Sequence, residues 1–234
     1  MIASAFPVLV ATFIIITAKE PAIKLVKSGR DKYLDIARKG VSSFLNHKAL
    51  KSLALNGIFV YAGAYFLIWL YQPQLQKLGV AIIYFGFIRA LFALSGVVFN
   101  HNLQLTEKLF GSSSKFFNLT TLMTVISLLL IAVFPSVATI ILAIILIGGL
   151  GQARFTALNS YMNDQIPSER RATTLSTISM LNRIVLILLN PAVGFIADHS
   201  LRGAFLFVGA LSLVALVFIP LRLPKASESP NNRS

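Results

Sequence analysis

Long apolar runs that contain almost no charged residue constrain this chain more than any other feature of its sequence. A helix needs about 20 apolar residues to cross the hydrocarbon core of a bilayer, and each run is long enough for one crossing. One run continues past Pro135 and is long enough for two crossings. The sequence therefore predicts seven transmembrane segments, at residues 1–18, 52–72, 80–99, 116–134, 136–157, 172–197 and 203–221.

All seven segments are expected to be helices, because lipid offers no hydrogen-bond partner to a free backbone N–H or C=O group. The composition agrees with this interpretation, since 56% of the residues are hydrophobic and only 12% are charged. An average soluble domain has roughly 25% charged residues. The predicted fold class is therefore all-α, a polytopic membrane protein.

The positions of the basic residues predict how the segments are oriented. Most of the 21 Lys and Arg residues lie in the 19–51 segment, in loops on the same side, near the end of a crossing at Arg154, or in the tail 222–234. If successive segments cross in alternate directions, only the loop residues Lys77 and Arg202 fall on the other side. Lys and Arg are enriched on the cytoplasmic side, so we expect an integral protein of the plasma (inner) membrane with a cytoplasmic C-terminus.

The net charge of +13 would suggest nucleic-acid binding in a soluble protein. Here the basic residues are spread over several loops instead of gathering in one folded surface, so no nucleic-acid partner is expected. The 19–51 segment could be a basic amphipathic helix on the membrane surface or a solvated linker, and its charge pattern favours the linker. A signal peptide at 1–18 is disfavoured, because the basic residues follow the apolar run instead of preceding it.

Residue types that carry metal or catalytic chemistry are scarce. The chain has no cysteine, and its three histidines lie far apart, at His47, His101 and His199, so no metal site and no cofactor are expected. No Asp or Glu lies inside a predicted crossing, and no serine has an obvious base in reach. The sequence therefore indicates a protein that is not an enzyme and has no catalytic residues.

Two predicted crossings contain an arginine near the middle of the membrane, Arg89 and Arg183. An arginine at this depth costs at least about 2.5–3.5 kcal/mol on insertion scales, so both side chains must face protein or water. Helical spacing places Asn190 on the same face as Arg183, with Asn182 beside it, which makes that face polar. These residues are therefore candidates for substrate binding.

Two tyrosines in the 52–72 segment, Tyr61 and Tyr65, are four residues apart and share one helix face. Such a face could line a cavity and bind substrate, or it could pack against another helix. The sequence alone leaves both interpretations open.

The run NSYMNDQIPSERRATTLSTISMLNR, followed closely by LLNPAVGFIAD, resembles a known family. Transporters of the major facilitator superfamily often have a cytoplasmic loop of the form D-x-x-P-x-x-x-R-A-x-x-L-S in their C-terminal half. The resemblance implies that 52–221 is a six-helix bundle equivalent to helices seven to twelve. It also implies that 19–51 corresponds to the central loop and 1–18 to the sixth helix, so that the five N-terminal helices are missing.

The resemblance also implies a function: secondary transport of a small solute between two halves, either alone or coupled to a proton or another ion. A missing N-terminal half or a second copy of the chain would then be a partner, beside the lipid bilayer. The alternative is a non-transporting membrane fragment, or an interaction partner of another membrane protein. Under the transporter interpretation, Arg89 and Arg183 could be neutralised by an anionic substrate, by acidic side chains of the missing half, or by backbone carbonyls and water.

The loop in this motif contains five residues of interest, which are Asp164, Pro167, Glu169, Arg170 and Arg171. Pro167 and Glu169 suit the first turn of the following helix, where a missing N–H and a negative charge are both favourable. The acidic residues could pair with Arg170, Arg171 or Arg154, or the arginines could simply anchor the helix at the membrane surface.

Overall fold

The computed structural model describes residues 38, 41–42, 44–168 and 171–221. The chain divides into two units, Met1–Ala37 and Arg38–Ser234, and every described residue lies in the second unit. The predicted crossing at 1–18, most of the 19–51 segment and the tail 222–234 therefore lie outside the described residues.

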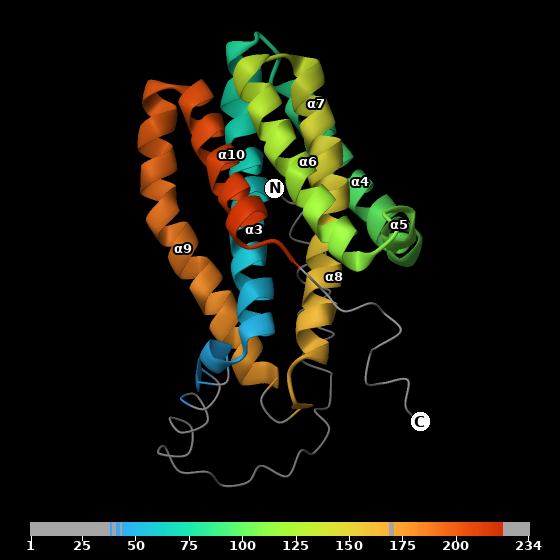
Figure 1. Ribbon diagram of the computed structural model, residues 1–234. Helices are drawn as coiled ribbons and strands as arrows, with labels where there is room; N and C mark the ends of the chain where they lie inside the picture. The colour runs from blue at the N-terminus through green and yellow to red at the C-terminus, as the bar shows by residue number, and fades with distance from the viewer. Residues whose placement is uncertain (1–37, 39–40, 43, 169–170, 222–234) are drawn as a thin grey trace, which may run out of the picture. The chain divides into compact units, whose positions relative to one another are not determined.

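The described residues form helices and no strand, as the sequence predicts (Figure 1). The elements are α3 (Lys48–Lys77), α4 (Ile83–His101), α5 (Leu103–Leu109), α6 (Ser113–Val133), α7 (Val137–Ile145), the π-helical turn η1 (Leu146–Leu150), α8 (Gly151–Asp164), α9 (Arg171–His199) and α10 (Leu201–Phe218). Because α7, η1 and α8 run on without a break, they form one span, Val137–Asp164.

The described helices include six spans that are long and apolar enough to cross a membrane. They coincide with the six predicted crossings between residues 52 and 221, and the all-α prediction is confirmed. The largest boundary difference is at the fourth of them, where the prediction ends at residue 157 and the helix continues to Asp164.

Short polar caps separate the spans. Pro135 stands between α6 and α7, and Ser136 then caps α7 in a capping box with Thr139. Ser112 and Ser200 accept hydrogen bonds from the first turns of α6 and α10 in the same way. These caps satisfy N–H groups that a helix leaves free, so the chain can turn sharply at the membrane surface.

The spans pack in an order that differs from their order in the sequence. α4 lies against α7, η1 and α8; α8 in turn contacts α3, and α3 contacts α9. Helices α6 and α10 pack on each other and on α3. The close approach of α4 to η1 depends on Gly148 and Gly149, because an added Cβ would meet the rings of Phe92 and Phe99 at 2.8 Å and 2.5 Å.

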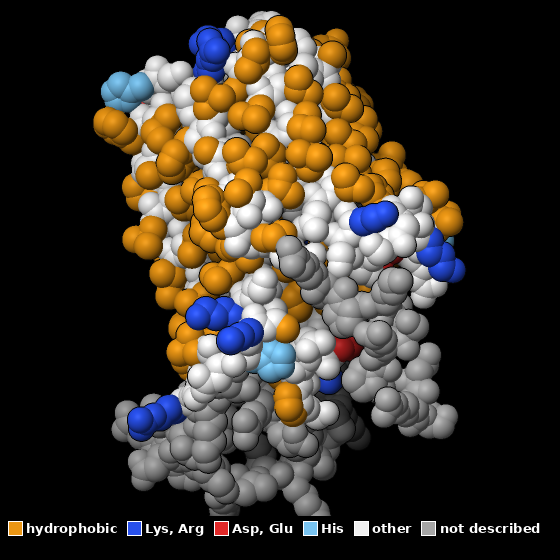
Figure 2. Space-filling model, viewed as in Figure 1, with side chains coloured by type: hydrophobic (Ala, Val, Ile, Leu, Met, Phe, Trp, Pro, Cys, Tyr) orange, Lys and Arg blue, Asp and Glu red, His pale blue; other side chains and the backbone are white. Residues whose placement is uncertain are grey.

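Polar and apolar side chains separate along the spans. In Figure 2, hydrophobic side chains cover most of the upper part of the visible surface, and most Lys and Arg side chains lie in the lower part. We call the lower end, where α3 begins and α8 ends (Figure 1), the basic end of the bundle.

Candidate functional site

A cavity of about 280 Å³ lies between α3, α8 and α9. Its apolar wall includes Phe155 and Leu158 of α8. Its polar lining consists of Tyr61, Asn159, Ser179, Asn182 and Arg183. The cavity therefore collects polar groups from three membrane spans.

The polar groups of α9 in this cavity have no partners among the described residues. Arg183 is exposed and makes no hydrogen bond or ion pair with any of them. The Oδ1 atom of Asn182 is buried and also accepts no hydrogen bond from them. No Asp or Glu lines the cavity, so the described site has a positive charge and an unused acceptor.

Three of the residues singled out from the sequence thus meet in one place, namely Tyr61, Asn182 and Arg183. Tyr65 does not line this cavity. Its ring lies 6.4 Å from that of Tyr61, 5.1 Å from that of Phe66 and 6.3 Å from that of Trp69, so it belongs to an aromatic row along α3. Asn190 is exposed farther along α9 and is not part of the cavity.

Arg89 lies in a different hollow, of about 580 Å³, between α4 and α8. Asn100, whose Oδ1 is buried without a partner in the described chain, also lines this hollow. The guanidinium carbon of Arg89 lies 4.9 Å from the ring centre of Phe92, so the charge makes a cation–π contact. The two midplane arginines therefore do not share one cavity.

A polar stripe on α8, formed by Gln152, Thr156 and Asn159, runs from one hollow toward the other. Their spacing places the three side chains on one helix face. Gln152 lines the hollow of Arg89, and Asn159 lines the cavity of Arg183. Sequence reasoning overlooked this stripe, although its three-to-four-residue spacing was visible.

Arg154, which was assigned to the cytoplasmic basic residues, is instead buried inside the bundle and only 3% exposed. Its Nη1 donates to the backbone oxygen of Phe117 at 3.1 Å, and its Nη2 donates to Oδ1 of Asn56. Its guanidinium carbon also lies 5.1 Å from the centre of the Phe117 ring. The error arose because α8 extends to Asp164, which places Arg154 about 15 Å along the helix from that end.

Asn56 connects this arginine to the end of α10. Its Nδ2 donates to the backbone oxygens of Ala215 and Ile219, at 3.3 Å and 2.7 Å. These carbonyls belong to the last turn of α10 and the residue that follows it. The Ala215 oxygen also accepts from the Ile219 N–H, whereas the Ile219 oxygen is one of the acceptors beyond the helix that need a partner from outside it. One buried network therefore joins α3, α6, α8 and α10.

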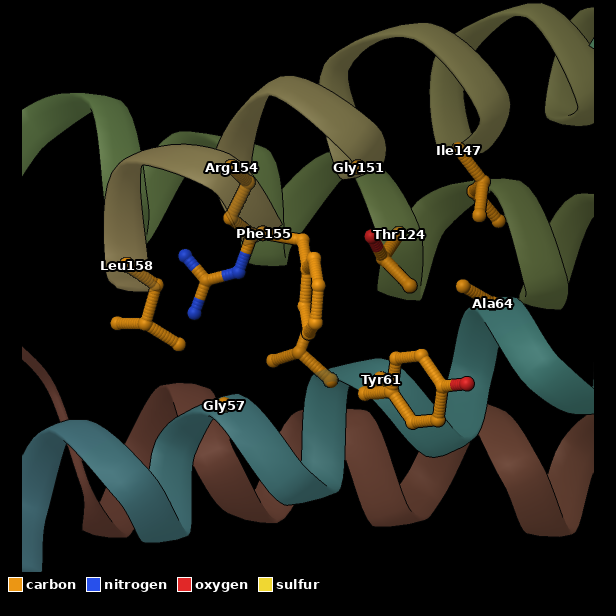
Figure 3. A pocket seen from close by; sticks show the side chains of 10 residues that line it. Gly57, Tyr61, Ala64, Thr124, Ile147, Gly151, Arg154, Phe155 and Leu158 are labelled. Carbon is orange, nitrogen blue, oxygen red and sulfur yellow. The ribbon is translucent and has the colours of Figure 1, made fainter. Parts of the chain in front are cut away.

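A small cavity of about 30 Å³ borders Arg154. Figure 3 shows Arg154 and Phe155 extending from α8 toward α3, where Gly57 and Tyr61 lie. Tyr61 and Phe155 also line the larger cavity, and their rings are 5.8 Å apart. This aromatic pair therefore lies between the buried arginine and the cavity of Arg183.

The loop residues of the motif make few contacts. Asp164 is the last residue of α8 and forms no ion pair with a described arginine, so the alternative in which it pairs with Arg154 or Arg171 is not found in this part of the chain. Pro167 lies between the end of α8 at Asp164 and the beginning of α9 at Arg171, so it is not in the first described turn of α9. Arg171 donates to the Ile166 oxygen at 3.5 Å. Glu169 and Arg170 lie outside the described residues.

A carboxyl group contacts the basic end from α5. Glu107 hydrogen-bonds with Ser113 and Tyr161, whose own hydroxyl groups are 2.6 Å apart. Burial raises the pKa of the Glu107 carboxyl above its usual value, although the two hydrogen bonds act in the opposite direction. This group links α5 to the beginning of α6 and the end of α8.

Comparison with known proteins identifies the family. The model of the Major Facilitator Superfamily matches residues 53–234. No curated protein and no solved structure matched the chain. The family match covers nearly all of α3 and every later span, in agreement with the resemblance seen in the sequence. The chain therefore belongs to the Major Facilitator Superfamily and is an integral membrane protein of the transporter type found in that family.

Proposed function

We propose that this chain supplies the C-terminal half of a secondary transporter and that the cavity between α3, α8 and α9 is part of its solute path. The solute is a small molecule that moves by alternating access between this half and a second one. The observation that carries the proposal is Arg183, which lines a cavity in the middle of a span and has no partner among the described residues.

The position of Arg183 supports this interpretation. It lies close to the middle of the 29-residue helix α9, where contact with hydrocarbon would cost at least about 2.5–3.5 kcal/mol. A water-filled path removes that cost. The polar stripe of Gln152, Thr156 and Asn159 supports the same conclusion, since exposed amide and hydroxyl groups within a span are also unfavourable in lipid.

The proposal includes the domain layout and the orientation expected from the sequence. Residues 52–221 form the six-helix bundle, 19–51 a cytoplasmic linker, 1–18 a helix equivalent to the sixth of the family, and 222–234 a cytoplasmic tail. The protein would reside in the plasma (inner) membrane. Any coupling proton would bind elsewhere in the complete transporter, because the described spans carry Asp only at their ends, at Asp164 and Asp198.

Thiol labelling tests the solute path directly, because the chain has no cysteine of its own. A cysteine at Ser179 would lie in the cavity, and its thiolate should react with a membrane-impermeant maleimide from water. Ala210 provides a matched control, because it is exposed at a comparable distance from the end of α10 but lines no cavity described here. Fast labelling at position 179 and slow labelling at 210 are expected.

Equal, slow labelling at both positions would show that no water reaches the cavity. The solute path would then be rejected in favour of a non-transporting membrane fragment or an interaction partner.

A further inference from the structure

We infer that the cavity between α3, α8 and α9 selects a small organic anion, with Arg183 as the residue that pairs with its carboxylate or phosphate group. The inference rests on the proposed solute path and adds the chemical class of the solute. It follows from the charges that line the cavity and from the partners that these charges lack.

The first observation is the imbalance of charge. Arg183 is the one charged residue among the lining residues, and no described carboxylate approaches it. The acidic residues of the described chain lie in α5 or at the ends of spans, at Glu107, Asp164 and Asp198. A cation entering this cavity would meet repulsion with no compensating carboxylate, whereas an anion would meet an unpaired guanidinium.

The second observation separates Arg183 from the other arginines in the spans. Arg154 already donates to Asn56 and to the oxygen of Phe117. Arg89 lies over the ring of Phe92. Arg183 alone among these three described arginines has neither a hydrogen bond nor a ring contact with the described residues, so its whole guanidinium group is available. Its planar fork of N–H donors has the geometry that binds a carboxylate or phosphate by two hydrogen bonds.

The third observation concerns the rest of the anion. The buried Oδ1 of Asn182 has no hydrogen-bond partner among the described residues, and leaving such an acceptor unpaired is unfavourable. Because this oxygen is itself covered, the Asn182 side chain must turn toward the cavity before a hydroxyl or amine of the solute can donate to it. The aromatic pair Tyr61 and Phe155 provides an apolar wall for the carbon skeleton. These contacts favour an organic anion over a bare inorganic one.

The depth of the site indicates the source of the anion. Because Arg183 lies near the middle of α9, it is far from both layers of lipid headgroups, which lie at the ends of a span. The anion is therefore a solute that enters from water and not a phospholipid headgroup.

Charge-selective labelling of the full chain with a cysteine at Ser179 tests the inference without knowing the solute. The two reagents are the anionic sulfonatoethyl methanethiosulfonate and the cationic trimethylammonioethyl methanethiosulfonate. The ratio of anionic to cationic labelling rates should exceed the ratio for free β-mercaptoethanol in the same buffer. In the Arg183→Gln background the ratio should fall about tenfold, because one positive charge next to the reacting thiol is removed.

Two further variants make the result specific. Arg183→Lys keeps the charge and should keep the ratio high, which also shows that the cavity tolerates substitution at this position. Arg202→Gln removes a positive charge from the first turn of α10, away from the cavity, and should leave the ratio unchanged.

The possible outcomes distinguish the two proposals. If neither reagent reacts at position 179, the solute path fails, and the inference fails with it. If both reagents react but their ratio equals that of β-mercaptoethanol, or does not change in Arg183→Gln, the path stands and the anion selectivity is overturned.

Discussion

Two arginines in neighbouring parts of the bundle have opposite surroundings. Arg154 is 3% exposed, and its guanidinium contacts Asn56 and both the oxygen and the ring of Phe117. Arg183 is exposed at a cavity and contacts no polar partner in the described chain. The comparison shows that an arginine within a span can either be held between packed helices or be left open at a cavity.

The contrast extends to the helices that carry the two residues. Arg154 lies on α8, whose neighbours α3 and α6 supply its acceptors. Arg183 lies on α9, which has only four buried residues, namely Thr174, Thr177, Ile178 and Val193. The part of α8 around Arg154 is therefore the better-packed region, and the face of α9 is the more open one.

Among the variants that test this comparison, Asn56→Leu is expected to have the largest effect on stability. This change removes the oxygen that accepts from Arg154 Nη2, so a buried charge loses one of its partners. It also removes the two hydrogen bonds that Asn56 Nδ2 donates to the end of α10. We expect the free energy of unfolding to fall by about 3–5 kcal/mol. The midpoint of thermal unfolding of the purified protein in detergent would measure the loss.

Two controls accompany this variant. Asn190→Leu, at an exposed position of α9 with no described partner, should change stability by less than about 0.5 kcal/mol. Replacing the arginine as well, in Asn56→Leu with Arg154→Met, should recover part of the loss, because no unpaired charge remains. An unfolding midpoint in Asn56→Leu equal to that of the wild type would show that the Arg154 network does not hold the bundle together.

A smaller effect on stability is expected when pH changes the charge of Glu107, which contacts the basic end of the bundle from α5. Because burial raises its pKa in the fold, the protonated form is favoured there. Its contribution to stability is fully present at pH below the usual glutamate value and is lost as pH rises through the raised value. In that window the wild type should lose stability with rising pH, and Glu107→Gln should lose less.

Unfolding midpoints measured over a pH series for both proteins would test this direction of the change in stability with pH. Midpoints that rise with pH in the wild type, or the same slope in Glu107→Gln, would contradict the assignment to Glu107.

The smallest effect on stability is expected for Arg183→Gln. Since Arg183 has no partner in the described chain, its removal breaks no hydrogen bond there, and the free energy of unfolding should stay within about 0.5 kcal/mol of the wild type. The same thermal measurement that detects the Asn56→Leu loss applies here. A loss as large as that of Asn56→Leu would mean that Arg183 is structural and that the two arginines do not differ as described.

Much of the fold followed from the sequence, because span length and lack of charge depend on local composition alone. The six described spans and the break at Pro135 were predicted on that basis. The end of α8 was placed too early, because the polar residues beyond 157 look like a loop when burial is unknown. Burial depends on neighbouring helices, which a single sequence does not reveal.

The candidate site was predictable to a similar degree. Arg183, Asn182 and Tyr61 were selected from their depth and spacing, and they do line one cavity. The role of Arg154 was missed, because its partner Asn56 is 98 positions away in the sequence. Charge alone favoured a surface position for Arg154, and only the contact between distant helices shows otherwise.

The π-helical turn Leu146–Leu150 has a consequence for the angular position of every side chain on α8. A π-helical turn holds one residue more than an α-helical turn would, so it rotates the following helix about its axis. One residue corresponds to about 100° of rotation. Arg154 and the stripe of Gln152, Thr156 and Asn159 point to opposite sides of α8, so removing this single extra residue would turn both away from their present neighbours. The rotation set by this turn thus decides which side of α8 contacts the bundle and which side faces the proposed solute path.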